Sequence, residues 1–215
     1  MSRSIQKQDS KPVFIFDIGG VVIKWKDNDP IFRYVAKRYH LPFAKTKRVM
    51  HDGLADVEWG RKSCEEYIEE SLARLGKEKR KGDNAEKLIT LPFEKLAKTR
   101  LGTIQIIRLL KKKGYKVYAL SNTSRPHVEV MRKKGWTTPL FDRFFASCEI
   151  RALKPHKDAY LKVLKEIHVK PENAIFIDNS EKNIEGAIRA GIGKCIHFHS
   201  LVSLRKEISK ILNDS

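Results

Sequence analysis

Cysteines are few and no apolar run is long, and each scarcity excludes a class of protein. The 215 residues contain three cysteines, which are far apart and form no CxxC pair. This excludes a disulfide framework, gives no zinc signature and favours the reducing cytoplasm. The longest apolar stretch, 13–23, is interrupted by Asp17 and is too short to span a bilayer, so we expect no membrane partner. Because residues 1–11 are polar, we also expect no signal peptide.

Acidic residues are scarce relative to basic ones. Lysine and arginine total 44 against 26 aspartates and glutamates, which gives a formal net charge of +18. Such an excess favours an anionic partner, either nucleic acid, a membrane surface or a phosphorylated metabolite. The basic clusters at 77–81, 111–113 and 132–134 contain no interleaved aromatic residues. They are typical of solvated helix faces, which disfavours nucleic acid as the main partner without excluding it.

The sequence does contain apolar β-type runs that alternate with helical patterns. This alternation predicts an α/β fold of Rossmann type, with a mostly parallel sheet flanked by helices. The expected strands are 13–16, 116–120, 174–177 and 193–198, with a weaker fifth at 143–147. The expected helices are 101–110, 158–167, 184–188 and 201–212.

The segment from Asp27 to about Leu96 differs from the rest because it contains almost no strand signal. Apolar residues recur at helical spacing within 31–38 and again within 67–75. Leu91-Pro92 predicts a turn where this segment ends. The sequence therefore predicts a helical subdomain at 27–96, inserted into a core formed by 1–26 and 97–215.

Small or acidic polar residues follow three of the expected strands. Asp17 follows the first strand, Ser121 the second and Asp178 the third. Ligands bind beyond the carboxyl ends of parallel strands, so we expect these side chains to meet there. Two neighbouring carboxylates repel each other, and Mg²⁺ offsets that repulsion while binding a substrate phosphate. Such a phosphate is placed for attack by Asp17, and a buried lysine would balance the charge.

Four short motifs resemble, in their order, those of the haloacid dehalogenase (HAD) superfamily. They are Asp17-Ile18-Gly19-Gly20-Val21, Ser121-Asn122-Thr123, Lys154-Pro155 and Asp178-Asn179. Each motif alone is common, whereas all four at the superfamily's spacing are specific. The resemblance covers 13–198 and places the helical insertion where subfamily I carries its helical C1 cap. Segments 58–67 and 121–127 are similar to the sugar-phosphatase-like and dehalogenase-like branch.

This resemblance implies roles for individual residues. Asp17 corresponds to the nucleophile, and Lys154 corresponds to the catalytic lysine. The Mg²⁺ ligands would be Asp17, the backbone carbonyl of Gly19, and Asp178.

The substrate contacts follow from the same resemblance. Ser121 and Asn122 correspond to the phosphate-binding positions, and Glu58 in the cap is a candidate substrate contact. The implied activity is a Mg²⁺-dependent phosphatase acting through an aspartyl-phosphate on a small phosphorylated metabolite, with a sugar phosphate as the best single candidate. The sequence does not indicate an oligomeric state.

Two positions depart from the family pattern. Gly19 stands where phosphatases of this family usually carry a second Asp, which protonates the leaving oxygen and later activates water. Asn179 stands where many members have a second acid. Loss of a general acid slows hydrolysis of poor leaving groups by about 10²–10⁴-fold. Glu58 and His127 are the candidates to replace it.

The departures keep other interpretations open. Haloacid dehalogenases also lack the second Asp and need no Mg²⁺, but they need an apolar pocket and an arginine. Candidate arginines in the cap are Arg33, Arg38 and Arg61.

Two more alternatives involve other residues. Phosphonate-cleaving relatives need a cap lysine, for which Lys24, Lys26 and Lys62 are available. A non-catalytic binding protein is the remaining alternative, with Gly19 and Asn179 as marks of lost catalysis.

Overall fold

The centre of the computed structural model, which describes residues 11–25 and 29–213, is a parallel sheet. Its five strands lie in the order β5-β4-β1-β6-β7. They are β1 (Val13–Phe16), β4 (Val117–Ser121), β5 (Arg143–Ala146), β6 (Ala174–Asp178) and β7 (Lys194–His197). The predicted α/β fold is confirmed, and the strand ends agree within one residue.

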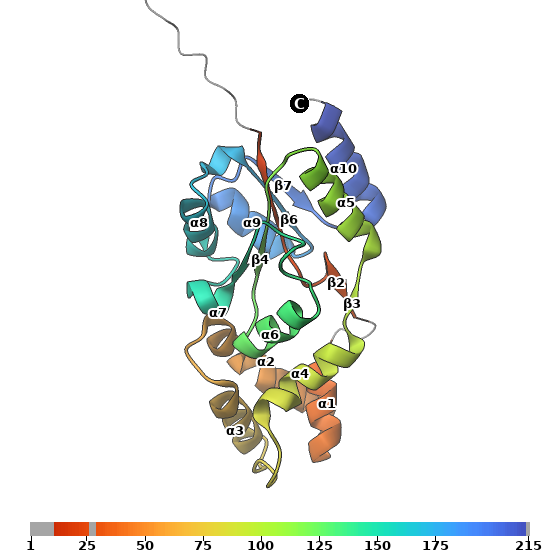
Figure 1. Ribbon diagram of the computed structural model, residues 1–215. Coiled ribbons are helices and arrows are strands. Elements are labelled where there is room, and N and C mark those ends of the chain that lie inside the picture. The colour runs from red at the N-terminus through yellow and green to blue at the C-terminus, as the bar shows by residue number, and fades with distance from the viewer. Residues whose placement is uncertain (1–10, 26–28, 214–215) are drawn as a thin grey trace, which may run out of the picture.

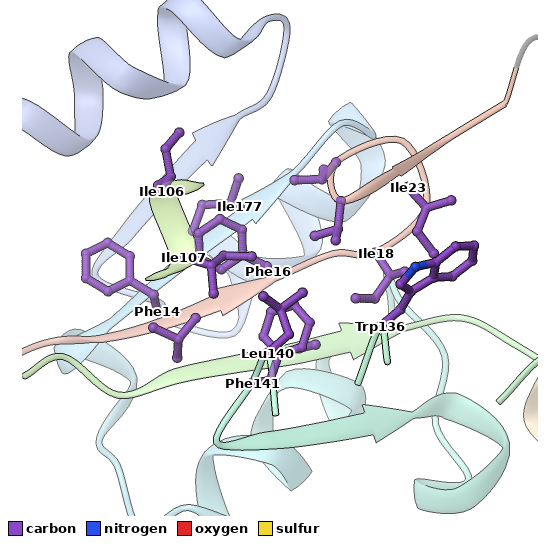
Figure 2. Packing of buried hydrophobic residues seen from close by; sticks show 14 of the residues in the cluster. Phe14, Phe16, Ile18, Ile23, Ile106, Ile107, Trp136, Leu140, Phe141 and Ile177 are labelled. Atoms are coloured by element: carbon purple, nitrogen blue, oxygen red, sulfur yellow. The ribbon is translucent and has the colours of Figure 1, made fainter. Parts of the chain in front are cut away.

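Alternate residues of β1 pack on opposite faces of the sheet. Phe14 and Phe16 join a cluster with α5 (Leu101–Lys112) and α10 (Leu201–Asn213), and Figure 2 shows part of it. Val13 and Ile15 face α8 (Lys157–Glu166) and α9 (Glu181–Arg189) on the other side. Figure 1 shows these two helix layers with the sheet between them. A strand buried on both faces is apolar throughout, which explains the unbroken run before Asp17.

The remaining core helices have the following bounds: α6 (Arg125–Lys133), α7 (Ser147–Ile150) and the 3₁₀ turn η1 (Pro171–Asn173). Among the described residues, no helix combines the length and hydropathy needed to cross a membrane.

Four helices lie at one end of the molecule (Figure 1). They are α1 (Pro30–Tyr39), α2 (Phe43–Trp59), α3 (Cys64–Arg74) and α4 (Ala85–Leu96). Their apolar faces form a cluster of their own that includes Phe32, Met50 and Ile68. These helices, called the cap below, occupy the segment in which the sequence predicts a helical subdomain. The predicted boundary between residues 26 and 27 lies outside the described residues.

A two-stranded antiparallel ribbon joins the cap to the core and was not expected. It pairs β2 (Ile23–Lys24) with β3 (Lys98–Thr99). The N–H of Arg100 also donates to the carbonyl of Val22 at 2.8 Å. Strands of two residues are too short to leave an alternating pattern in a sequence.

The predicted turn at Leu91-Pro92 is wrong, because α4 continues through Pro92 to Leu96. Proline has no N–H, so the helix loses one backbone hydrogen bond at this point. Burial of Ile89, Pro92 and Phe93 against neighbouring helices offsets that loss.

Helix α9 contacts the loop that carries Lys154, which gives a first prediction. A Cβ added at Gly186 would lie 2.3 Å from the carbonyl oxygen of Pro155. Gly186→Ala should therefore push α9 from this loop and lower the free energy of unfolding by about 1–3 kcal/mol, measured by urea denaturation. Lys182→Ala, on the exposed face of the same helix, is the control and should change little. Equal stability of the two variants would contradict the close packing.

Candidate active site

Three buried charged side chains meet at the carboxyl ends of neighbouring strands. Asp17 follows β1, Asp178 ends β6, and Lys154 comes from the loop before α8. Lys154 Nζ lies 2.5 Å from Asp17 Oδ1 and 2.7 Å from Asp178 Oδ2. The three residues are 6%, 4% and 1% exposed in the order Asp17, Lys154, Asp178. The structure thus brings together the predicted nucleophile, lysine and second carboxylate.

Burial and charge act against each other in this cluster. Burial raises the pKa of Asp17 to about 7, while the nearby charge of Lys154 opposes the shift and that of Asp178 adds to it. Burial alone would lower the pKa of Lys154, but the two carboxylates outweigh it and raise that pKa. Lys154 therefore stays protonated, and one cation serves two carboxylates. A divalent cation at this place would favour ionised Asp17.

The side chain of Asn122 fixes the backbone of Lys154. Its Nδ2 donates to the carbonyl of Lys154 at 2.9 Å, and the N–H of Lys154 donates to Asn122 Oδ1 at 3.0 Å. The Asn122 amide thus positions the lysine. Its predicted contact with phosphate stays a prediction, as does that of Ser121, which is buried at the end of β4.

Two further donors hold the carboxylate of Asp178. The N–H of Ser180 donates to Oδ1 at 2.8 Å, and Asn183 Nδ2 donates to Oδ2 at 2.9 Å. Asn183 was not predicted from the sequence, because one asparagine just before an expected helix gives no distinguishing signal. These contacts fix the orientation of the carboxylate toward Lys154.

The oxygen atoms at the strand ends suit Mg²⁺. Asp17, Asp178 and the carbonyl of Gly19 are hard donors, and Mg²⁺ completes such a set with waters and a phosphate oxygen. No group of three or more His, Cys, Asp or Glu that could hold a metal occurs in the described part of the chain, so the ion would depend on those additional ligands. Gly20 has φ +90°, and a Cβ there would lie 2.5 Å from Asn179 Oδ1. The turn after Asp17 therefore closely approaches the loop after β6.

A cavity of about 290 Å³ lies between core and cap. At its core end are Gly19, Ser121 and Asn122, and Glu58 of α2 lines it from the cap. Burial raises the pKa of Glu58 to about 7, with the charges of Lys154 and Asp17 acting on it in opposite directions. Glu58 is therefore a carboxyl that faces the cavity and gains or loses a proton near neutral pH.

Ser147 links Glu58 to the core. Its Oγ donates to the carbonyl of Glu58 at 2.5 Å and accepts from the N–H of Thr123 at 2.9 Å. A Cβ at Gly60, in the left-handed region with φ +83°, would lie 2.9 Å from the carbonyl of Cys148. The end of α2 therefore rests on α7. Ser147 was not predicted as a site residue, because it stands at the end of an expected strand.

His127 belongs to the packing between α4 and α6. Its Nδ1 lies 3.1 Å from Ser124 Oγ, and its Nε2 lies 3.3 Å from the carbonyl of Ile89. Burial lowers the pKa of His127 to about 4, so the ring is neutral at pH 7. Both nitrogens have partners within the protein, which leaves Glu58 as the better placed of the two candidate proton donors.

The cap arginines do not line the cavity. Arg38 pairs with Asp83 at 2.6 Å, and Arg61 pairs with Asp56 at 3.4 Å. Arg33 lies over the ring of Phe43. The dehalogenase alternative therefore lacks, among the described residues, the arginine that it needs to bind a carboxylate.

The candidate lysines of the phosphonate-cleaving alternative do not favour it either. Lys62 bonds Glu70 at 2.5 Å, Lys24 is exposed on β2, and neither lines the cavity. Lys26 lies outside the described residues.

Comparison with known proteins gives the family. A profile described as haloacid dehalogenase-like hydrolase matches residues 11–191. The chain belongs to this family and is a hydrolase of the HAD superfamily, which confirms the resemblance stated from the four motifs.

Several relatives are named as phosphatases. The chain is 27% identical over 189 residues to a phosphorylated carbohydrates phosphatase of Thermotoga maritima, covering 83% of this chain and 81% of that protein. It is 32% identical over 87 residues to the sesquiterpene phosphatase astK of Aspergillus oryzae, covering 40% and 44%. A match to the drimenol cyclase drtB of Aspergillus calidoustus, 30% identical over 96 residues, covers 45% of this chain and 18% of that protein. The last two matches thus span less than half of those relatives.

Solved structures share the fold. A HAD-like family hydrolase from Porphyromonas gingivalis has a TM-score of 0.73 at 23% identity, covering 95% of this chain and 99% of that one. A HAD family enzyme from Bacteroides thetaiotaomicron, solved with magnesium and inorganic phosphate, has a TM-score of 0.70 at 22% identity, covering 87% and 93%.

The raised pKa of Glu58 predicts how stability varies with pH. A carboxyl whose pKa is higher in the folded than in the unfolded state stabilises the protein below the unfolded value, and that contribution is lost as pH rises through the folded value. Between pH 4.5 and about 7, wild type should lose about 1–2 kcal/mol relative to Glu58→Gln, after allowance for solvent screening. Urea unfolding in EDTA across this range measures the difference. Parallel curves for the two proteins would contradict the assignment.

Proposed function

We propose that this protein is a Mg²⁺-dependent phosphatase that hydrolyses a small phosphorylated metabolite through an aspartyl-phosphate at Asp17. The observation that carries the proposal is the buried contact of Lys154 with Asp17 and Asp178 beside the cavity. Phosphatase names among the relatives support the reaction, and a neighbouring fold solved with magnesium and phosphate supports the cofactor. A small phosphorylated substrate is the partner that follows.

In the first step, a carboxylate oxygen of Asp17 attacks phosphorus and forms a new P–O bond. The P–O bond to the organic group breaks, and the departing oxygen keeps the electron pair and takes a proton from Glu58. Lys154 holds Asp17 in place and offsets negative charge on the transferring group. Mg²⁺, when bound through Asp17, the Gly19 carbonyl and Asp178, would supply further neutralisation of that charge.

In the second step, water attacks phosphorus of the aspartyl-phosphate and gives a proton to the ionised Glu58. The P–O bond to Asp17 breaks, which releases inorganic phosphate and restores both carboxyl groups. Ser121 and Asn122 would hold the phosphate oxygens, aided by backbone N–H groups at the start of α6. The same carboxyl thus acts as acid and then as base.

The proposed setting is the cytoplasm. The free thiols of Cys64, Cys148 and Cys195 support this proposal.

Removal of the nucleophile gives the decisive test of the reaction. Asp17→Asn should abolish Mg²⁺-dependent phosphate release from a panel of phosphomonoesters, and EDTA should do the same to wild type. Thermal unfolding of the variant checks that it is folded. Equal turnover by Asp17→Asn, or turnover unaffected by EDTA, would contradict the proposal, and halide release from haloacids would then be measured.

The role of Glu58 predicts a dependence on the leaving group. Glu58→Gln should lower kcat/KM, which reports formation of the aspartyl-phosphate and not its hydrolysis, by about 10²–10⁴-fold for alkyl phosphates. It should affect kcat/KM for 4-nitrophenyl phosphate little, because nitrophenolate departs without a proton. The control is Glu94→Gln, an exposed carboxyl of the cap. Equal loss on both substrates would exclude proton donation by Glu58.

A second substitution, at Gly19, tests whether Glu58 acts as the proton donor. A Cβ at Gly19 would meet only Trp25 at 3.9 Å, and φ of Gly19 lies outside the left-handed region, so the position accepts a side chain. Gly19→Asp combined with Glu58→Gln should recover alkyl phosphate hydrolysis relative to Glu58→Gln alone. Failure of this recovery, with a folded double variant, would indicate that Glu58 has another role.

A further inference from the structure

The cavity has two chemically different ends. At the core end, Gly19, Ser121 and Asn122 adjoin the buried cluster of Asp17 and Lys154, where the proposed function places the phosphate. The other end extends into the cap and must hold the organic group of the substrate. The residues there bear directly on substrate class, because a site selects the part of a substrate that it can desolvate.

The cap end is apolar. Its wall is formed by aromatic and aliphatic side chains of the residue after β2 and of α1, α2, α4 and α6: Trp25, Ile31, Phe32, Leu54, Ile89, Phe93 and Met131. Phe93 packs against Trp25 with ring centroids 5.2 Å apart and against His127 at 4.6 Å. This wall would remove water from an apolar group and offers flat surfaces to an aromatic one.

Three polar side chains at this end already have partners within the protein. The hydroxyl of Tyr67 donates to the carbonyl of Met50 at 2.8 Å, both ring nitrogens of His127 have partners, and Asp29 pairs with Lys47 at 2.7 Å. Besides Glu58, this leaves His51, which is exposed. A sugar would therefore bring several hydroxyls to a wall that offers few matching groups, and most of their desolvation would be uncompensated.

The placement of basic side chains also favours an apolar organic group. Within the described part of the chain, no lysine or arginine lines the cavity, so a second phosphate or a carboxylate on the organic group would lack a cation. The excess of basic residues thus lies elsewhere on the molecule and does not select the substrate at this wall.

We infer that the substrate is the phosphomonoester of a small apolar alcohol, aliphatic or aromatic, whose carbon skeleton fills the cap end of the cavity. This inference rests on the proposed phosphatase function. The volume of about 290 Å³ is at the lower end for ligand pockets, which limits the organic group to a small one. The sugar phosphate expected from the sequence is the competing substrate.

The test measures kcat/KM for phosphate release from ethyl, butyl, hexyl and octyl phosphate, with glycerol 3-phosphate and glucose 6-phosphate as polyol counterparts. Each added methylene should raise kcat/KM about fourfold until the cavity is full, and the polyol esters should be poorer substrates than alkyl esters of similar size. A flat series, or a preference for the polyol esters, would overturn the inference and leave the phosphatase proposal in place.

Variants of the wall check where the preference arises. Leu54→Gln and Ile31→Thr, at half-buried positions of α2 and α1, should each lower the ratio of kcat/KM for hexyl phosphate over ethyl phosphate about tenfold or more. Leu54→Met keeps volume and polarity and should preserve the ratio. Leu101→Gln, on the exposed face of α5, is the distant control. An unchanged ratio in both wall variants would overturn the assignment of this wall.

A binding measurement separates failure of the inference from failure of the proposed function. Alkylphosphonates have a P–C bond in place of the P–O ester bond, so calorimetry of their binding to wild type with Mg²⁺ needs no turnover. Their Kd should fall with chain length as kcat/KM rises. Chain-length-dependent binding without phosphate release from any ester would overturn the phosphatase proposal alone. Binding independent of chain length would overturn the apolar substrate class.

Discussion

The arrangement of this site depends on one buried cation. Lys154 pairs with two carboxylates that neighbouring strands bring within hydrogen-bonding distance of it. Breaking a buried pair of this kind by removing one partner typically costs about 3–5 kcal/mol, so the surrounding structure must hold all three groups in place. Asn122 fixes the lysine backbone, Asn183 orients Asp178, and α9 packs on the same loop through Gly186. Much of the packing at the carboxyl end of the sheet therefore holds these three charged groups in contact.

The chemistry is divided between the two parts of the fold. In the proposed mechanism, the core supplies the groups that would bind and transfer the phosphoryl group, placed by strand order and by the loop that carries Lys154. The cap supplies Glu58 and most of the apolar wall, which would face the organic group attached to the phosphate. A change of cap residues would thus alter the substrate without disturbing the cluster around Lys154.

The sequence predicted the core well because strands buried on both faces leave unbroken apolar runs, and Asp17, Ser121 and Asp178 stand where those runs end. Contacts between distant segments leave no such mark. Ser147 was placed at the end of an expected strand, and its role depends on the end of α2, which is remote in sequence. The turn predicted at Pro92 is wrong because tertiary packing keeps this residue within α4. The apolar wall combines residues from four helices with Trp25 after β2, so no local pattern reveals it.

The ribbon of β2 and β3 adjoins both crossings of the chain between core and cap, since β2 precedes α1 and β3 follows α4. Any rotation of the cap relative to the core would therefore be centred near this ribbon. Ser147 bonds the end of α2 to the chain after β4. Opening the cap would break this hydrogen bond and move Glu58 away from Asp17. A cap position that admits substrate and one that holds Glu58 near Asp17 would thus exclude each other.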